Sequence, residues 1–260
     1  MNRGDPRNSG ILCTSEMTGT IDGRTSLARR IGPAWHGHVF LFDRPIEPPA
    51  YTNARGLRLL GLAIVLEVFR IATNVAGPAV PSFRFWAPLI VFLAFACLRR
   101  LGFTGRQMGL RPWREWNATE KSYFIQTLIL ANVVFPAVFA AQLSRAFSQS
   151  TAPVLVGVFI AYLFLGFFQE LLYRGMLQME LTRRWGAFAG ILVSNLLYTF
   201  VQHSEYFGLA ASLAVPMFAG VFAIGLLFGV VFWRSGNLWI VGVMHALGNA
   251  YIVTAFGNIR

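Results

Sequence analysis

Long apolar stretches separated by short polar breaks dominate the chain from Gly56 onward. Each stretch approaches or exceeds the roughly 20 residues that an α-helix needs to cross a bilayer. The pattern predicts seven membrane-spanning helices, at about 57–77, 85–101, 122–146, 152–180, 186–204, 208–233 and 236–257. We therefore expect an all-α fold, a polytopic transmembrane helix bundle of about seven spans, with an eighth, interfacial helix as the alternative count.

The same pattern divides the chain into three parts. Residues 1–56 contain no long apolar run and many Gly, Pro, Ser and Asn residues, so we expect a largely disordered cytoplasmic tail. Residues 57–151 should form N-terminal transmembrane helices, with an interfacial segment at 103–121 where Arg and Trp residues mix. Residues 152–257 should form the core that carries the chemistry.

Composition and charge support a membrane protein. Of all residues 55% are hydrophobic and only 13% are charged, which is far from the usual soluble domain. The net charge of +11 would suit a nucleic-acid-binding protein, but after residue 56 the 15 basic and six acidic residues gather between apolar stretches. Loops that flank membrane spans have this distribution, so we expect membrane lipid as a partner and no nucleic acid.

Basic residues also predict the orientation. The loop at 99–121 is the most basic, and Arg183, Arg184 and Arg234 fall on the same side of the predicted bundle. Because basic loops are retained in the cytoplasm, we expect a cytoplasmic N-terminus. The expected location is a multi-pass integral protein of the bacterial inner (plasma) membrane.

Polar side chains inside the apolar stretches point to function, because they are costly at membrane depth. They occur in the fourth, fifth and seventh predicted spans, at Gln169, Glu170, Arg174, His203, His245 and Asn249. Glu170 and Arg174 in the fourth span are four residues apart and share one helix face, as do His245 and Asn249 in the seventh. With a rise of about 1.5 Å per residue, all these groups fall within one slab of the bilayer. We expect them to line one cavity.

Each group also has a purely structural interpretation. Glu170 and Arg174 would be a neutralising pair, His203 an interface anchor, and the polar pair of the seventh span a link between helices. The coincidence of their depths favours a site. Glu67 and Arg70, three residues apart in the first span, are instead predicted to form a local ion pair.

The residue types indicate hydrolysis. A glutamate and a histidine together hold and deprotonate a water molecule, and a second histidine with an asparagine stabilises an oxyanion. Our hypothesis is that Glu170 and His203 position the hydrolytic water with help from Gln169, and that Arg174 holds Glu170 in place. His245 and its span partner would stabilise the oxyanion.

Two alternatives concern a metal and transport. Glu170, His203 and His245 are candidate ligands of a catalytic zinc ion, which binds three protein ligands and a water. The sequence has no His-Glu-x-x-His pair, so we expect no cofactor and keep zinc as the weaker alternative. A transporter is a further alternative, disfavoured because the sequence shows no internal repeat.

Three motifs together resemble the CPBP family, which comprises CAAX-protease and bacteriocin-processing membrane proteins related to the Rce1-type prenyl-protein endopeptidase. They are Gln169-Glu170-x-x-x-Arg174-Gly175, an aromatic-rich run ending in His203, and Gly236-Asn-Leu-Trp followed by His245-x-x-x-Asn249. The resemblance covers about residues 152–255. It implies a glutamic-type intramembrane endopeptidase that cuts near the C-terminal region of a membrane-anchored, lipidated or sorted protein.

The first motif of that family usually opens with two glutamates, and here Gln169 takes the first position. An amide orients water but does not accept its proton. The alternative function is therefore a catalytically impaired family member that acts in bacteriocin immunity or as a membrane scaffold.

Overall fold

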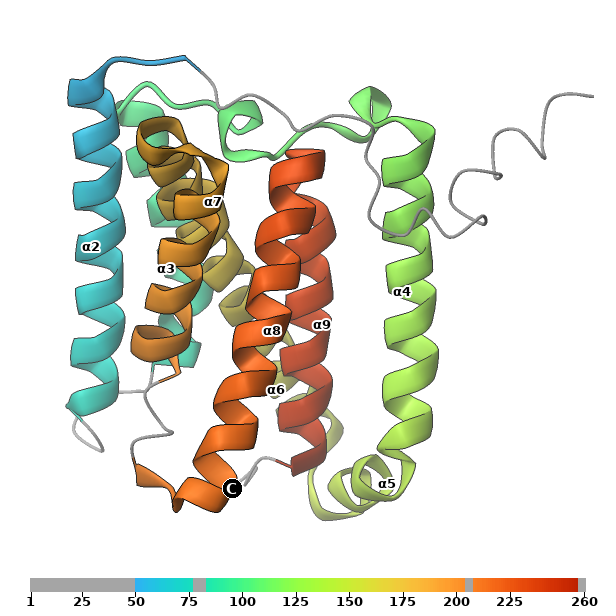
Figure 1. Cartoon of the computed structure of the whole chain (residues 1–260). Helices are drawn as coiled ribbons and strands as arrows, with labels where there is room; N and C mark the ends of the chain where they lie inside the picture. Colours follow the sequence, from blue (N-terminus) through green and yellow to red (C-terminus); the bar gives the residue numbers. More distant parts are fainter. Residues whose placement is uncertain (1–49, 77–82, 204–207, 257–260) are drawn as a thin grey trace, which may run out of the picture.

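The computed structural model describes residues 50–76, 83–203 and 208–256 (Figure 1). Within these ranges the chain is helical without strands, which confirms the predicted all-α bundle. The expected disordered tail lies outside the described residues as far as position 49. The helices are α2 (Asn53–Val75), α3 (Phe83–Arg100), α4 (Ala118–Val138), α5 (Ala140–Gln149), α6 (Ala152–Glu170), α7 (Met179–Leu197), α8 (Ala211–Ser235) and α9 (Leu238–Phe256).

By length and composition, four helical stretches of the described chain are apolar enough to cross a membrane. They are Ala118–Val138, Ala152–Gln202, Ala211–Ser235 and Leu238–Phe256. The second stretch is 51 residues long and is divided at Gly186, whose φ of 82° and ψ of 168° are not helical. It therefore makes two crossings. With α2 and α3, which run alongside but carry more charged residues, the bundle agrees with the expected count of about seven.

The structure divides the third predicted span, 122–146, into two helices. α4 begins before that span, because Asn117 and Glu120 form a capping box in which each side chain accepts the other's backbone N–H, at 2.8 and 2.9 Å. At Phe139 the φ of −103° and ψ of 20° interrupt the helix. The short α5 that follows lies at the far end of the bundle from the start of α4 (Figure 1).

Two 3₁₀ turns occupy the expected interfacial segment 103–121, at Arg106–Met108 and Trp113–Glu115. They lie at the end of the bundle where α4 and α9 begin (Figure 1). The turn residue Gly109, at φ 81°, sits where a Cβ would be 2.7 Å from the Phe232 ring. This loop therefore packs closely on the end of α8.

A close contact between α6 and α9 forms the centre of the bundle. A Cβ at Gly166 of α6 would lie 2.6 Å from the Cα of Ala246 and 3.0 Å from the carbonyl carbon of His245. Only glycine lets the two backbones approach this closely. Glu170 follows one helical turn after Gly166, so this contact brings its side chain beside α9.

Two π-helical segments extend the helices that enter the centre. η4 (Leu171–Gln178) continues α6 into α7, and η5 (Tyr198–Gln202) ends α7. π-helical turns are rare and occur mostly at functional sites. Of the candidate site residues, Arg174 lies in η4 and His203 directly follows η5.

Candidate active site

A buried carboxylate lies at the centre of the candidate site. Glu170, the last residue of α6, has no exposed surface. Its Oε1 atom is 2.8 Å from Nδ1 of His245 in α9, and its Oε2 atom is 3.3 Å from Nε of Arg174 in η4. Because an ionised carboxylate only accepts hydrogen bonds, Nδ1 donates, and a neutral His245 ring then presents Nε2 as an acceptor.

Arg174 connects this carboxylate to a third helix. Its guanidinium is fully buried, and Nη2 donates to the carbonyl oxygen of Gly225 in α8 at 2.9 Å. The guanidinium carbon also lies 5.3 Å from the ring centroid of Tyr198, a cation–π distance. The ion pair with Glu170 is therefore held by contacts to both α8 and η5.

Tyr198 lies between the two histidines. Its hydroxyl oxygen is 3.0 Å from Nε2 of His203 and 3.4 Å from Nε2 of His245. The ring is 3% exposed and meets both imidazoles edge to face. A phenol has one proton to donate and can also accept, so it can donate to one imidazole while it accepts from the other. Hydrogen bonds thus connect Glu170 to His203 through His245 and Tyr198.

A second pair joins α6 and α9 beside the first. Nδ2 of Asn249 donates to Oε1 of Gln169 at 3.0 Å. Gln169 is buried and Asn249 is half-buried. Gln169 directly precedes Glu170 in α6, and Asn249 follows His245 by four residues in α9, so two polar links cross this helix contact.

An outer group of polar side chains surrounds the site. Glu67 and Arg70 of α2 form an ion pair at 2.7 Å, which confirms the predicted local pair. Glu67 also accepts a hydrogen bond of 2.8 Å from the Tyr173 hydroxyl, and Arg70 donates to the carbonyl oxygen of Val201 at 3.0 Å. This pair therefore ties α2 to both π-helical segments.

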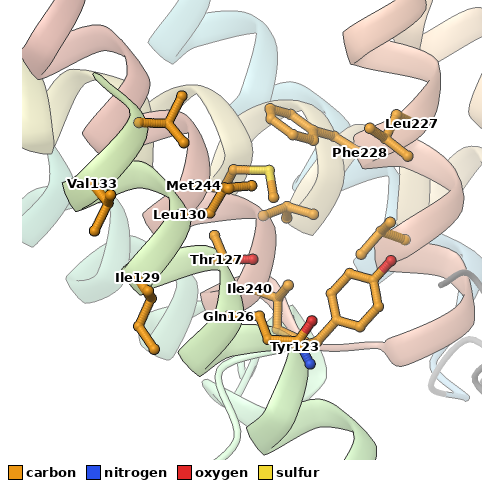
Figure 2. A pocket seen from close by; sticks show the side chains of 13 residues that line it. Tyr123, Gln126, Thr127, Ile129, Leu130, Val133, Leu227, Phe228, Ile240 and Met244 are labelled. Carbon is orange, nitrogen blue, oxygen red and sulfur yellow. The ribbon is translucent and has the colours of Figure 1, made fainter. Parts of the chain in front are cut away.

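An apolar cleft of about 620 Å³ opens beside the site, between α4 on one side and α8 and α9 on the other (Figure 2). Its wall includes Leu130, Ile240 and Met244. Phe228 lines the same cleft, and its ring centroid is 5.7 Å from that of His245. One aromatic ring thus separates the cleft from the polar cluster.

Comparison with protein families shows which family part of the chain resembles. Residues 151–251 match the family described as type II CAAX prenyl endopeptidase Rce1-like. This segment resembles that family. The match contains all the residues of the polar cluster and confirms the predicted resemblance. Comparisons with curated proteins and with solved structures gave no match. The Rce1-like family is a protease family, and together with the apolar helices it supports an integral membrane protease.

Within the Rce1-like segment, the structure brings the six predicted site residues into one cluster. Gln169 and Glu170, which are adjacent in α6, each bond a side chain of α9. The expected pairing of Glu170 with His203 is indirect, because the direct partner of Glu170 is His245. Their catalytic roles remain predictions.

Sequence reasoning missed Tyr198 as a site residue. It lies five positions before His203, a spacing that places two side chains on different faces of an α-helix. In the π-helical η5, however, the backbone repeat is wider and the two side chains meet. The only available signal was its place in the aromatic-rich run that ends in His203.

The metal alternative concerns three of the same residues. Among the side chains that the structure describes, no group of three or more His, Cys, Asp and Glu residues is arranged to hold a metal ion. Glu170 and His203, two of the three proposed zinc ligands, are linked here through other side chains. The expectation that no cofactor is required remains a prediction.

Proposed function

We propose that this protein is an intramembrane endopeptidase that hydrolyses a peptide bond near the C-terminal region of a membrane-anchored, lipidated or sorted protein. The observation that carries the proposal is the buried Glu170–His245 hydrogen bond beside the Gln169–Asn249 pair, inside an Rce1-like segment. An acid and a histidine held together in this way activate water.

The geometry favours His245 as the group that accepts the proton of the water. Glu170 orients its ring and stabilises the imidazolium that forms, and Arg174 keeps the carboxylate in place. The water oxygen forms a bond to the carbonyl carbon while its proton moves to Nε2 of His245. When the carbon–nitrogen bond breaks, the same proton passes to the leaving amine.

Donors for the oxyanion are available on both sides of this pair. His203 and Tyr198 form one group, and the Asn249 amide, which now donates to Gln169, forms the other. Gln169 helps to orient the water but does not accept its proton. In this proposal the base is the histidine, so a glutamine at position 169 is compatible with turnover.

The apolar cleft fits a substrate that stays in the membrane. It opens between α4 and the two helices that contribute Phe228 and Met244, and its lining is almost wholly apolar (Figure 2). A lipid chain or an apolar segment in this cleft would gain contact with these side chains. The ring of Phe228 would then lie between the anchor and the reacting bond.

We further propose that residues 152–257 form the catalytic core and that residues 57–151 are supporting helices. The Rce1-like match begins at residue 151, one residue before the proposed core. The proposed location is the bacterial inner membrane with a cytoplasmic N-terminus, and membrane lipid and a protein or lipopeptide are the proposed partners.

The experiment is proteolysis in nanodiscs by the purified protein, with a fluorescent lipidated peptide as substrate. Glu170→Ala, His203→Ala and His245→Ala should each lower turnover by about 10²–10⁴-fold, because they remove, in turn, the carboxylate that orients the base, a donor to the oxyanion and the base itself. A metal chelator should leave the wild-type rate unchanged. The control is Glu115→Gln, which changes a carboxylate on the loop before α4. Full activity in any of the three alanine variants would contradict the site.

The second candidate is a catalytically impaired family member that acts in immunity or as a scaffold. The observation in its favour is the hydrogen bond that occupies the Asn249 amide with Gln169. Gln169→Glu separates the two candidates. An impaired enzyme should gain activity from none, whereas a working site should show similar or lower activity.

A further inference from the structure

The helix that leads to His203 ends with a carbonyl group that is bonded from another helix. The last four carbonyl groups of a helix have no N–H partner within it. One of them belongs to Val201, two residues before His203 in the π-helical η5. Nη2 of Arg70, in α2, donates to this oxygen at 3.0 Å. A cation at a helix C-terminus also interacts favourably with the helix dipole. Arg70 therefore caps this helix end.

Arg70 stands on the buried face of α2, where an apolar residue would be expected. The buried residues of this helix include Leu59, Ala63, Leu66, Arg70 and Thr73. Arg70 is 4% exposed, although the other side chains of the stripe carry no charge. A charge is costly at membrane depth, and such residues are usually kept for function. The cap on η5 is a candidate for that function.

Glu67 fixes the direction of the guanidinium. Its Oε1 and Oε2 atoms accept hydrogen bonds from Nη2 and Nε of Arg70, at 2.7 and 3.0 Å. A bidentate pair of this kind holds both side chains in one geometry. The Tyr173 hydroxyl also donates to Oε1, but the two bonds to Arg70 do not depend on it. Helical spacing predicts this local pair, whereas the contact with Val201 depends on how α2 packs.

The direction of the His203 side chain depends on where its helix ends. His203 directly follows η5 with φ −109° and ψ 48°, which are not helical values. Its Nε2 atom lies 3.0 Å from the hydroxyl oxygen of Tyr198. Each residue turns an α-helix by about 100°, so a shift of the helix end by one residue would carry the imidazole away from that hydroxyl. A bond that fixes the end of the helix therefore also fixes the imidazole.

We propose that Arg70 is a positioning residue of the candidate active site: it caps the helix end before His203 and so holds the imidazole against Tyr198, and Glu67 holds Arg70. The inference rests on the proposed endopeptidase function, in which His203 and Tyr198 serve the oxyanion. Arg70 and Glu67 lie outside the Rce1-like match at residues 151–251. One N-terminal helix, α2, thus completes the site.

The test removes the whole ion pair and so separates positioning from stability. Arg70→Met alone leaves Glu67 as an unpaired carboxylate and should lower both the unfolding temperature and kcat. The double variant Glu67→Gln/Arg70→Met removes both charges and keeps an acceptor for Tyr173, so its unfolding temperature should return close to the wild-type value. The cap on Val201 is still missing. We therefore expect kcat on a lipidated peptide to stay about tenfold below wild type, with KM unchanged.

Two further variants complete the comparison. Arg70→Lys keeps the charge but not the planar fork, so it should keep part of the wild-type kcat. The control Arg58→Met changes an exposed arginine of the same helix and should behave as wild type. If the double variant regained the wild-type kcat together with its stability, or lost activity only through KM, Arg70 would have no positioning role and the proposal would be overturned.

Hydrogen–deuterium exchange separates this inference from the proposed function, because it needs no turnover. Without the cap, the backbone amides of η5 should exchange about tenfold faster in the double variant than in the wild-type protein, while those of α9 should not change. If the wild-type protein cleaves no peptide but exchange in η5 rises in this way, the cap stands and the proposed function fails. Unchanged exchange in η5 overturns the cap.

Discussion

At the residue scale, the hydroxyl of Tyr198 links two imidazoles, one from the residue that follows η5 and one from α9. It lies 3.0 Å from His203 and 3.4 Å from His245. The neighbouring Tyr173 packs edge to face on the same ring, but its hydroxyl bonds Glu67 outside the cluster. The two tyrosine rings therefore pack on each other, but their hydroxyls have different partners: that of Tyr198 contacts the two histidines, and that of Tyr173 bonds Glu67.

Tyr198→Phe should lower kcat by about tenfold and leave KM unchanged, because it removes the hydrogen bonds that orient both imidazoles and keeps the ring. It should also change the pH dependence of kcat, since both histidines lose a polar neighbour. Steady-state kinetics across pH measures both effects.

Tyr173→Phe is the control for this prediction. It removes a hydroxyl of the same kind one ring away, and we expect an unchanged kcat and pH profile with at most a small loss of stability. If the two phenylalanine variants had the same kinetics, Tyr198 would be a packing residue and not a positioning residue.

At the element scale, glycines determine how closely α8 approaches α7. A Cβ at Gly225 would lie 2.0 Å from Oδ1 of Asn195, and one at Gly229 would lie 3.0 Å from Ile191. Gly225 also supplies the carbonyl oxygen that Arg174 binds. The contact between these helices therefore positions the ion pair at the centre of the site.

Gly225→Ala should destabilise the protein and lower turnover, because the added methyl group displaces Asn195 and moves the carbonyl that holds Arg174. We expect a loss of roughly 1–3 kcal/mol, the usual cost of overpacking, measured by thermal unfolding in detergent. Gly220→Ala is the control in the same helix, because a Cβ there meets nothing within 4 Å. Equal effects of both substitutions would show that loss of glycine itself is responsible.

Sequence patterns predicted what lies within one helix better than what lies between helices. The pairs Glu67–Arg70 and Glu170–Arg174 follow from α-helical spacing and are both present. The partners of Glu170 and Gln169 on α9 depend on the close approach at Gly166, which no periodicity reveals. The sequence pattern did not predict the break at Phe139 for a similar reason. An apolar stretch shows how long a helical region is, but it does not show where the chain changes direction.

At the scale of the whole molecule, polar contacts at one end of the bundle join the N-terminal helices to the Rce1-like segment. Glu180 is buried and accepts hydrogen bonds from Tyr51, at 2.6 Å, and from Arg183. Burial and the bond to this carboxylate raise the pKa of Tyr51, so its hydroxyl stays protonated and donates at physiological pH. Residues on both sides of the proposed domain boundary thus form one structure.

The basic residues gather at this same end of the bundle, so their positions predict how the protein is oriented in the membrane. The loop with Arg106 and Arg114 lies where α4 and α9 begin, and α5 with Arg145 lies at the opposite end (Figure 1). Since basic loops remain in the cytoplasm, we expect the first end inside and the α5 end outside. The candidate site would then be reached from within the membrane, through the cleft beside α4.

Single cysteines test this orientation in a background in which Cys13 and Cys97 are serine. Arg114→Cys and Ser148→Cys place thiols at exposed positions of the two ends. In intact cells a membrane-impermeant maleimide should label the cysteine at 148 and not the one at 114, and permeabilisation should make both reactive. The reverse labelling would show that the protein has the opposite orientation in the membrane. The positive charges of the 99–121 loop would then need a role other than retention in the cytoplasm.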